Sequence, residues 1–271
     1  MAFPTLFDVI FPIAIFVVGA PIVYLLSRAL KLRPKPITIA DPRSEATATF
    51  LVVVALFAAR FALDTLGYLV VLPSFPLYRL PPYPPFAAVD VFWYAVVSAI
   101  YLLPIILAMK RTGQSLGSIG ITGVDKGRNL ALGFLLSGIY VGGLCLLAPS
   151  LGRTFAGFSV SLVYAFILHA IVGFSQEVVW RGYVQTRLIA YGGTVKGLGA
   201  ATLICGLWYF PMRYFQYSGV ALEAFADILV GLPIWLLVGY IALRSQNVIS
   251  PSIFHLFYNW TTTSLWQIPI S

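Results

Sequence analysis

Residues 129–149 read NLALGFLLSGIYVGGLCLLAP, a run of 21 residues that contains no charged side chain. About 20 apolar residues in succession have the length that an α-helix needs to cross the hydrocarbon core of a bilayer. The rest of the chain has the same character, because 60% of its 271 residues are hydrophobic and only 10% are charged. Soluble globular proteins are about 45–50% apolar and about 25% charged, so a water-soluble enzyme is excluded.

Further apolar runs lie on both sides of this stretch, and together with it they predict eight membrane-spanning helices. The other ranges are 6–30, 48–72, 87–109, 158–176 with a helical extension towards 190, 198–215, 220–243 and 251–266. Continuous apolar runs favour helices over the strands of a membrane barrel, in which hydropathy alternates. The predicted fold is therefore all-α, a polytopic membrane protein with a bundle of about eight transmembrane helices in a lipid bilayer.

Prolines lie inside several of these ranges and are candidate positions for kinks: Pro12, Pro21, Pro104, Pro211 and Pro233. Ser250 and Pro251 precede the last range and have the side chains typical of an N-cap and a first helical turn. We therefore expect the last helix to begin at Pro251.

Basic residues are distributed unevenly between the predicted connections. Only three lie in the even-numbered connections (Arg79, Arg153 and Arg213), whereas thirteen of the 17 flank the odd-numbered ones: Arg28, Lys31, Arg33, Lys35, Arg43, Lys110, Arg111, Lys126, Arg128, Arg181, Arg187, Lys196 and Arg244. Short loops rich in Lys and Arg stay in the cytoplasm, so both termini are predicted to be extracytoplasmic, and we expect the plasma membrane to be the location.

The net charge of +8 has the same interpretation. It indicates orientation in the membrane and affinity for anionic lipid headgroups. No basic run alternates with aromatic residues on a soluble surface, so nucleic acid is not an expected partner.

Ionisable residues inside membrane spans are candidates for function, because burying a charge in a bilayer is costly. Arg60 and Asp64 lie four residues apart and can pair on one helix face. This pair gives weak support to a transporter, while the lack of a visible internal repeat counts against one. Asp90, Glu223 and Asp227 lie near predicted helix starts, where a carboxylate faces the positive end of the helix dipole.

Two short motifs concentrate polar side chains near predicted helices. The first is QEVVWR, residues 176–181, in which Glu177 and Arg181 lie about 40° apart on a helix and can form an ion pair. The second is HLFYN, residues 255–259, in which His255 and Asn259 can face one cavity.

These motifs resemble those of the CPBP family of intramembrane proteins, which includes the type II CAAX prenyl endopeptidases and the bacterial abortive-infection group. The family's Glu-Glu-x-x-x-Arg corresponds to Gln176–Arg181, its Phe-x-x-x-His to Cys205–Tyr209, and its His-x-x-x-Asn to His255–Asn259. The resemblance covers roughly residues 114–260. It divides one integral membrane domain into a three-span region, 1–113, and a CPBP-like five-span region, 114–271.

The resemblance implies that these positions line a cavity open to the cytoplasm and activate a water for peptide hydrolysis. The first Glu and the two His groups handle the water, and the Asn helps to stabilise the oxyanion. This chain has Gln176 in place of that Glu and Tyr209 in place of one His. A carboxamide cannot accept the water's proton, and a phenol with a pKa of about 10 is a poor base at neutral pH.

Other residues do not obviously replace the missing groups. Glu177 is turned about 100° from Gln176 along the helix, and His169 lies two turns, or about 10.5 Å, before Gln176. His255, Asn259 and Gln176 offer one good metal ligand, whereas a catalytic zinc site needs three. No cofactor is therefore predicted, and zinc would be expected only if family-type activity is retained.

Two functional hypotheses follow from the sequence. The first is a catalytically degenerate family member, a pseudoenzyme that acts as a scaffold, an assembly factor or a subunit of a membrane complex. Gly138 and Gly142 form a GxxxG pair that could contact a membrane protein partner or another helix of this chain. The alternative is an active intramembrane endopeptidase of the CAAX-protease type, with Glu177 as the base and His255 with Asn259 as oxyanion donors.

Overall fold

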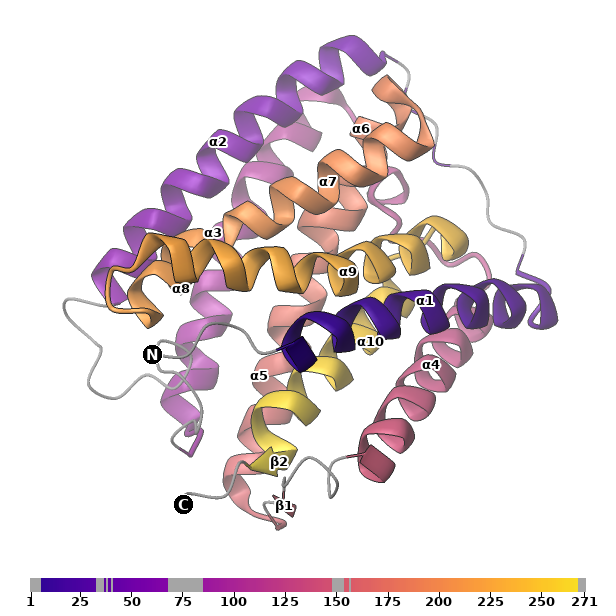
Figure 1. The fold of residues 1–271 in the computed structure, drawn as a ribbon. Coiled ribbons are helices and arrows are strands. Elements are labelled where there is room, and N and C mark those ends of the chain that lie inside the picture. The colour runs from indigo at the N-terminus through magenta and orange to yellow at the C-terminus, as the bar shows by residue number, and fades with distance from the viewer. Residues whose placement is uncertain are drawn as a thin grey trace.

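The computed structural model describes residues 6–32, 37, 39, 41–67, 85–147, 154–155 and 157–267. Helices dominate these residues (Figure 1). In chain order the elements are α1 (Leu6–Ala29), α2 (Pro42–Leu66), α3 (Ala88–Thr112), the short 3-10 helix η3 (Leu116–Ile119), α4 (Lys126–Leu147), β1 (Thr154–Phe155), α5 (Val160–Glu177), the π-helix η5 (Val178–Gln185), α6 (Thr186–Gly192), α7 (Thr194–Trp208), α8 (Phe210–Gln216), α9 (Ala221–Ser245), α10 (Ile249–Trp260), the π-helix η6 (Thr261–Leu265) and β2 (Trp266–Gln267).

Each of the eight predicted ranges coincides with a helix or a pair of helices. Within the described residues, six helical segments are long and apolar enough to cross a membrane, and the segment 160–192 runs through α5, η5 and α6. The other two ranges hold the shorter helices α7, with 15 residues, and α10, with 12. The prediction of an all-α polytopic membrane bundle is confirmed, and the chain is an integral membrane protein that has lipid as its surroundings.

Tyr209 interrupts the predicted helix 198–215. α7 ends at Trp208 and α8 begins at Phe210, with Pro211 in the first turn of α8. Proline lacks a backbone N–H and favours the first turn of a new helix over the interior of an old one. By contrast, α1, α3 and α9 continue through their prolines.

The predicted N-cap of the last helix is wrong. α10 begins at Ile249, two residues earlier than expected. The Ser250 hydroxyl donates to the backbone oxygen of Asn129 in α4 at 2.8 Å, so it joins two helices instead of capping one. The N-cap residue is Val248, which makes no side-chain capping bond, and the side chain of Asn247 before it accepts from the Ile249 backbone N–H at 2.7 Å.

The odd-numbered connections between the predicted spans, which follow α1, α3, α6 and α9, meet at one end of the bundle. Gly120 accepts a backbone hydrogen bond from Val248, which joins the connection after α3 to the one after α9. At the opposite end, β1 pairs with β2, and the Ser161 hydroxyl accepts from the backbone N–H of Phe86. In Figure 1 the α6–α7 connection and the C-terminal end of α9 lie at the upper right, and the α8–α9 turn lies at the opposite, left side.

The first three helices pack against later helices of the chain. α1 lies along α9, α3 lies along α5, and α10 lies between α4 and α5. Aromatic side chains fill the core between α2, α3, η5 and α7, with Trp180, Tyr183 and Trp208 all buried. α10 can therefore be shorter than the bilayer is thick, because protein surrounds it. The proline-rich stretch 73–84, which reads PSFPLYRLPPYP, lies outside the described residues.

Candidate functional site

The first motif lies where α5 changes into a π-helix. Gln176 and Glu177 end α5, and Arg181 lies within η5. All eight residues of η5 are buried. π-helical turns are rare and are found frequently at functional sites.

Glu177 forms the centre of a buried polar cluster. Its Oε1 lies 2.7 Å from Nδ1 of His255, and its Oε2 lies 3.4 Å from Nε of Arg181. An ionised carboxylate can only accept, so Nδ1 of His255 donates and Nε2 is left for another partner. The predicted pairing of Glu177 with Arg181 is present, and the contact with His255 brings together the two motifs, which are 78 residues apart.

The two substituted positions contact each other. The hydroxyl of Tyr209 donates to Oε1 of Gln176. The Tyr209 ring also stacks on Trp235 of α9, with the ring centroids 5.0 Å apart and the planes nearly parallel. The break between α7 and α8 places Tyr209 at this point. The Gln176 carboxamide oxygen and the Tyr209 hydroxyl are therefore hydrogen-bonded to each other. They stand at the two positions where the family carries a carboxylate and an imidazole.

A cavity of about 250 Å³ lies in front of these groups. Gln176, Tyr209, His255 and Asn259 line it, as do aromatic residues of α3 and α9. Glu177 and Arg181 do not line it and lie behind His255 and Gln176. The structure thus brings all six sequence-predicted site residues into one region and exposes four of them to one cavity.

His169 lines the same cavity, although its distance along the helix suggested that it was too far from Gln176 to share a site. The cavity extends along α5, so residues two turns apart both reach it. Nε2 of His169 lies 2.8 Å from the Thr263 hydroxyl of η6, and Thr263 also lines the cavity. The seven-residue spacing from Gln176, which keeps both on nearly one helix face, was the signal that could have included His169.

Two ion pairs complete the polar lining. Arg60 and Asp64 of α2 are 2.5 Å apart, which confirms the predicted pairing, and Arg213 of α8 contacts Asp227 of α9 at 2.8 Å. Tyr217, which lies between α8 and α9, donates to Asp227 at 3.3 Å. Burial and the Asp227 carboxylate together raise the pKa of Tyr217 to about 12, so it remains a neutral donor at physiological pH.

The donor set does not fit a catalytic zinc ion. No group of three or more His, Cys, Asp or Glu side chains that could hold a metal occurs in the described part of the chain. At the cavity wall, Gln176 and Tyr209 are bound to each other, and the carboxylate of Glu177 is paired with His255 and Arg181. A zinc site with three protein ligands would need at least two further groups beside His255.

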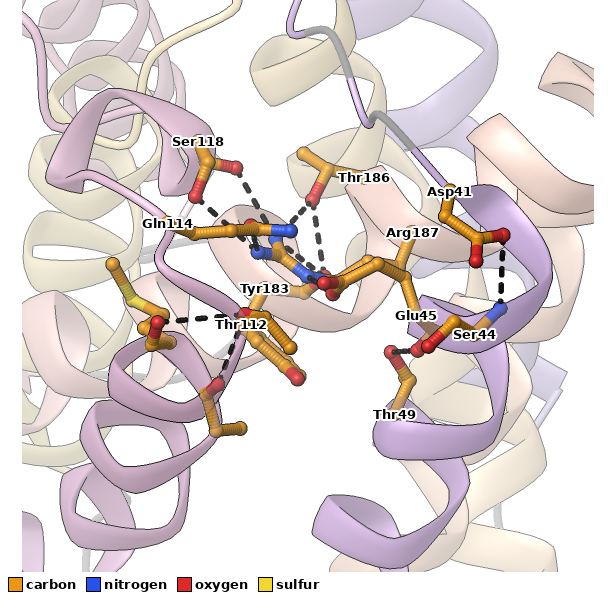
Figure 2. A network of polar contacts seen from close by, with 12 residues as sticks. Asp41, Ser44, Glu45, Thr49, Thr112, Gln114, Ser118, Tyr183, Thr186 and Arg187 are labelled. Carbon is orange, nitrogen blue, oxygen red and sulfur yellow. Dashed lines mark hydrogen bonds and ion pairs between the residues drawn. The ribbon is translucent and has the colours of Figure 1, made fainter.

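A second buried cluster surrounds Arg187 at the other end of the bundle (Figure 2). Its Nε lies 3.2 Å from Glu45 of α2, and its Nη2 donates to the Gln114 side chain after α3. Nη1 donates to the Ser118 backbone oxygen at 3.2 Å and to the Thr186 hydroxyl at 3.0 Å. From the sequence Arg187 is only one of the basic residues in a predicted connection, and no local pattern links it to residues 73 and 142 positions away.

Comparison with known proteins agrees with the motifs. The family model described as type II CAAX prenyl endopeptidase Rce1-like matches residues 157–261, which include α5 to α10 and all six site residues. The match begins later than residue 114, where the resemblance was expected to start. Comparisons with curated proteins and with solved structures gave no match. Residues 157–261 are therefore an Rce1-like type II CAAX prenyl endopeptidase domain of the CPBP family, carried by an integral membrane protein.

Proposed function

We propose that this CPBP-family membrane protein does not hydrolyse peptides by its family's mechanism and acts instead as a scaffold, assembly factor or subunit of a membrane complex. The observation that carries the proposal is the hydrogen bond between Tyr209 and Gln176. These two side chains stand where the family has its proton-handling Glu and one of its His groups. Neither can accept a proton from water at neutral pH, and each already has the other as a partner.

The position of Glu177 supports the same proposal. This carboxylate is the nearest replacement for the missing base, but it is buried and contacts both His255 and Arg181. A general base must reach the proton that it removes, either directly or through one water. Because Glu177 lies behind the cavity wall, it is better placed to orient His255 than to act on a bound water.

A face of α4 offers a contact for a partner. A Cβ added to Gly138 or Gly142 would meet no atom within 4 Å, so this GxxxG pair makes no close contact with the described residues. Small residues at this spacing allow a helix of another protein to approach closely in the membrane. Replacing both glycines with leucine would then release a co-purifying partner after mild detergent extraction, whereas a protein that is always a solitary monomer would argue against the scaffold.

A cleavage assay tests the absence of catalysis. The purified protein in lipid vesicles is incubated with a prenylated reporter peptide, beside the variants Gln176→Glu, Tyr209→His and their combination. We expect no cleavage by the wild type and measurable cleavage by the combined variant, in which both family groups are restored. Cleavage by the wild type that is lost in His255→Ala would overturn the proposal.

The alternative function, an active endopeptidase, is favoured by one contact. The 2.7 Å distance between Glu177 and Nδ1 of His255 holds the imidazole as a carboxylate does in hydrolases, with Nε2 left to act as a base. In this version His255 takes the proton and Glu177 positions His255. Peptide cleavage that falls in both Glu177→Gln and His255→Ala would favour this alternative.

A further inference from the structure

A second, smaller cavity lies between η5, the first turns of α6 and the C-terminal end of α9. Its volume is about 80 Å³, and it shares no lining residue with the cavity in front of Gln176 and Tyr209. Arg181 is part of its wall. We call it the Arg181 pocket, and it is a separate space beside a residue of the first motif.

The Arg181 pocket is closed at one end. Its lining includes Arg181 and Gln185, which are both buried, and Ala190, which is exposed. Gln246, at the C-terminal end of α9, is half-buried, and its Oε1 accepts from the backbone N–H of Ile37 at 3.3 Å. The pocket therefore opens between α6 and the end of α9, beside the connection that follows α1, and it ends at Arg181.

One nitrogen of Arg181 is left for a ligand. Nη2 donates to the Trp235 backbone oxygen at 2.9 Å, and Nε lies 3.4 Å from Oε2 of Glu177. Nη1 is buried and has no hydrogen-bond partner among the described residues. The Cys205 thiol lies beside this guanidinium group, but sulfur is only a weak acceptor.

Gln185 offers an unpaired acceptor in the same pocket. Its Nε2 donates to the Gly239 backbone oxygen at 2.9 Å, and its Oε1 is buried with no hydrogen-bond partner among the described residues. Turning the amide around would place its oxygen against that backbone oxygen, so Oε1 stays unpaired. A buried donor or acceptor without a partner is costly, and a bound molecule that pairs with both Nη1 and Oε1 would remove the cost.

The charges favour a neutral molecule. Arg181 is the only ionisable residue among those that line the pocket, and Glu177 already balances its charge. A bound anion would lie near the unpaired oxygen of Gln185 and would compete with Glu177, and a bound cation would face the guanidinium group. Either would bury a charge without a full partner, which is costly.

The volume limits the size of the molecule. About 80 Å³ is roughly half of the 150 Å³ or so in which a buried cavity holds a benzene molecule of six carbon atoms. The pocket therefore has room for about three or four non-hydrogen atoms. A carboxamide group has three, and it carries an acceptor oxygen and an N–H donor on one carbon.

We propose that the Arg181 pocket binds a small neutral molecule with a primary amide group, of the size of formamide, acetamide or urea. Its carbonyl oxygen accepts from Nη1 of Arg181, and its N–H donates to Oε1 of Gln185. The hydrogen bond between Ile37 and Gln246 narrows the approach, so the ligand is a free molecule and not a side chain of a partner helix. This site is separate from the cavity in front of Gln176 and does not depend on whether the protein cleaves peptides.

Disulfide exchange at an introduced cysteine tests the chemistry of the pocket. In a Cys145→Ala background, which removes the exposed thiol and keeps the buried Cys205, Leu243→Cys places a thiol on the pocket wall, one helical turn after Gly239. The purified protein is equilibrated with equal concentrations of the disulfides of mercaptoacetamide, mercaptoacetate and 2-methylpropanethiol. These three differ only in an amide, a carboxylate and an apolar group of similar shape, and mass spectrometry of the intact protein and its peptides gives the ratio of the adducts.

Gly123→Cys is the matched control, because atoms added there meet nothing within 4 Å. After normalisation to this control, we expect the amide adduct at Leu243→Cys to exceed each of the other two by about tenfold or more, since only the amide pairs with both buried atoms. A preference for the carboxylate would identify an anion site and overturn the proposal. Equal ratios would overturn it as well, because the pocket would then not recognise the group.

Gln185→Met tests the assigned contact in the same assay. Methionine is similar in length to glutamine but offers no strong acceptor, so the preference for the amide should fall to about twofold or less. A tenfold preference that survives this change would show that Gln185 is not the acceptor and would contradict the proposed geometry. Because no measurement involves cleavage, failure of this proposal and failure of the proposed function can be told apart.

Discussion

Two buried clusters in this protein are built from the same four residue types, and they differ in how completely they are bonded. One joins Arg187 to Glu45, Gln114 and Tyr183, and the other holds Arg181, Glu177, Gln176 and Tyr209. In the first, all three guanidinium nitrogens of the arginine have hydrogen-bond partners. In the second, Nη2 of Arg181 donates to the Trp235 backbone oxygen, but Nε and Nη1 have no hydrogen-bond partner among the described residues.

This difference separates a structural cluster from a candidate site. A buried polar group without a hydrogen bond is costly, so a fold normally provides partners for all of them. The guanidinium group of Arg187 obeys that rule, although the buried Tyr183 hydroxyl of the same cluster has no hydrogen-bond partner among the described residues. The Arg181 cluster is less complete and lies directly behind a cavity, which is the arrangement expected where a molecule binds or a reaction once took place.

The largest expected effect comes from breaking the Arg187 cluster. Arg187→Met removes the arginine and leaves the buried Glu45 carboxylate unpaired, which should lower the free energy of unfolding by about 3–5 kcal/mol. Thermal unfolding of the purified protein in detergent measures this loss. The double variant Glu45→Leu/Arg187→Met should recover much of it, because no lone charge then remains buried.

A matched control for this prediction is the exposed pair Arg128 and Asp125, 3.0 Å apart, in which the arginine side chain is 46% exposed. Arg128→Met should cost about 0–1 kcal/mol, because solvent screens the pair. If Arg187→Met were no more harmful than Arg128→Met, the description of the Arg187 cluster as a structural element would be wrong.

An intermediate effect tests the packed half of the bundle through its backbone. A Cβ on Gly197 of α7 would lie 2.5 Å from the Cα of Ile189 in α6, so Gly197→Ala should push these helices apart at a cost of about 1–3 kcal/mol. Gly199, two residues later on the same helix, has open space, and Gly199→Ala should leave stability unchanged or raise it by up to about 1 kcal/mol. Equal thermal stability of the two variants would contradict the close packing of α6 and α7.

The smallest expected effect comes from the cavity cluster. Tyr209→Phe removes the hydrogen bond to Gln176, but water in the cavity can replace the hydroxyl, so the loss should be about 1 kcal/mol or less. Ser250→Ala provides the comparison, because this fully buried hydroxyl donates to Asn129 away from the cavity. Its loss should cost about 1–3 kcal/mol. A Tyr209→Phe variant that is the less stable of the two would indicate a dry, structural Tyr209.

Hydropathy and short-range spacing were sufficient for the helices and for the contacts within one helix. They located helices in all eight predicted ranges, six of which lie in segments long and apolar enough to cross a membrane. They also located the Arg60–Asp64 and Glu177–Arg181 pairs, each of which joins residues four apart. The contacts of His255 with Glu177 and of Tyr209 with Gln176 could not be predicted from spacing, because they span 78 and 33 residues. Family motifs indicated which of these residues belong together, but not which of them would bond to which.

The break at Tyr209 and the π-helix at residues 178–185 escaped prediction for a different reason. Both depart from the period of 3.6 residues on which helix-face arguments depend. Pro211 was recognised as a candidate kink, yet only tertiary packing decides whether a helix bends or ends at a proline. In η5 the sequence VVWRGYVQ contains no proline that would have marked the change of geometry.

The π-helix η5 determines the angle between Arg181 and Arg187, which belong to different clusters. Arg181 faces the candidate site and Arg187 faces the anchoring cluster, and the wider turn between them determines how far the backbone rotates from one to the other. Deleting one residue here would change both the rotation and the rise of the backbone between Arg181 and Arg187. We therefore expect η5 to tolerate changes of side chain far better than changes of length, so that insertions and deletions, more than point substitutions, would disable this protein.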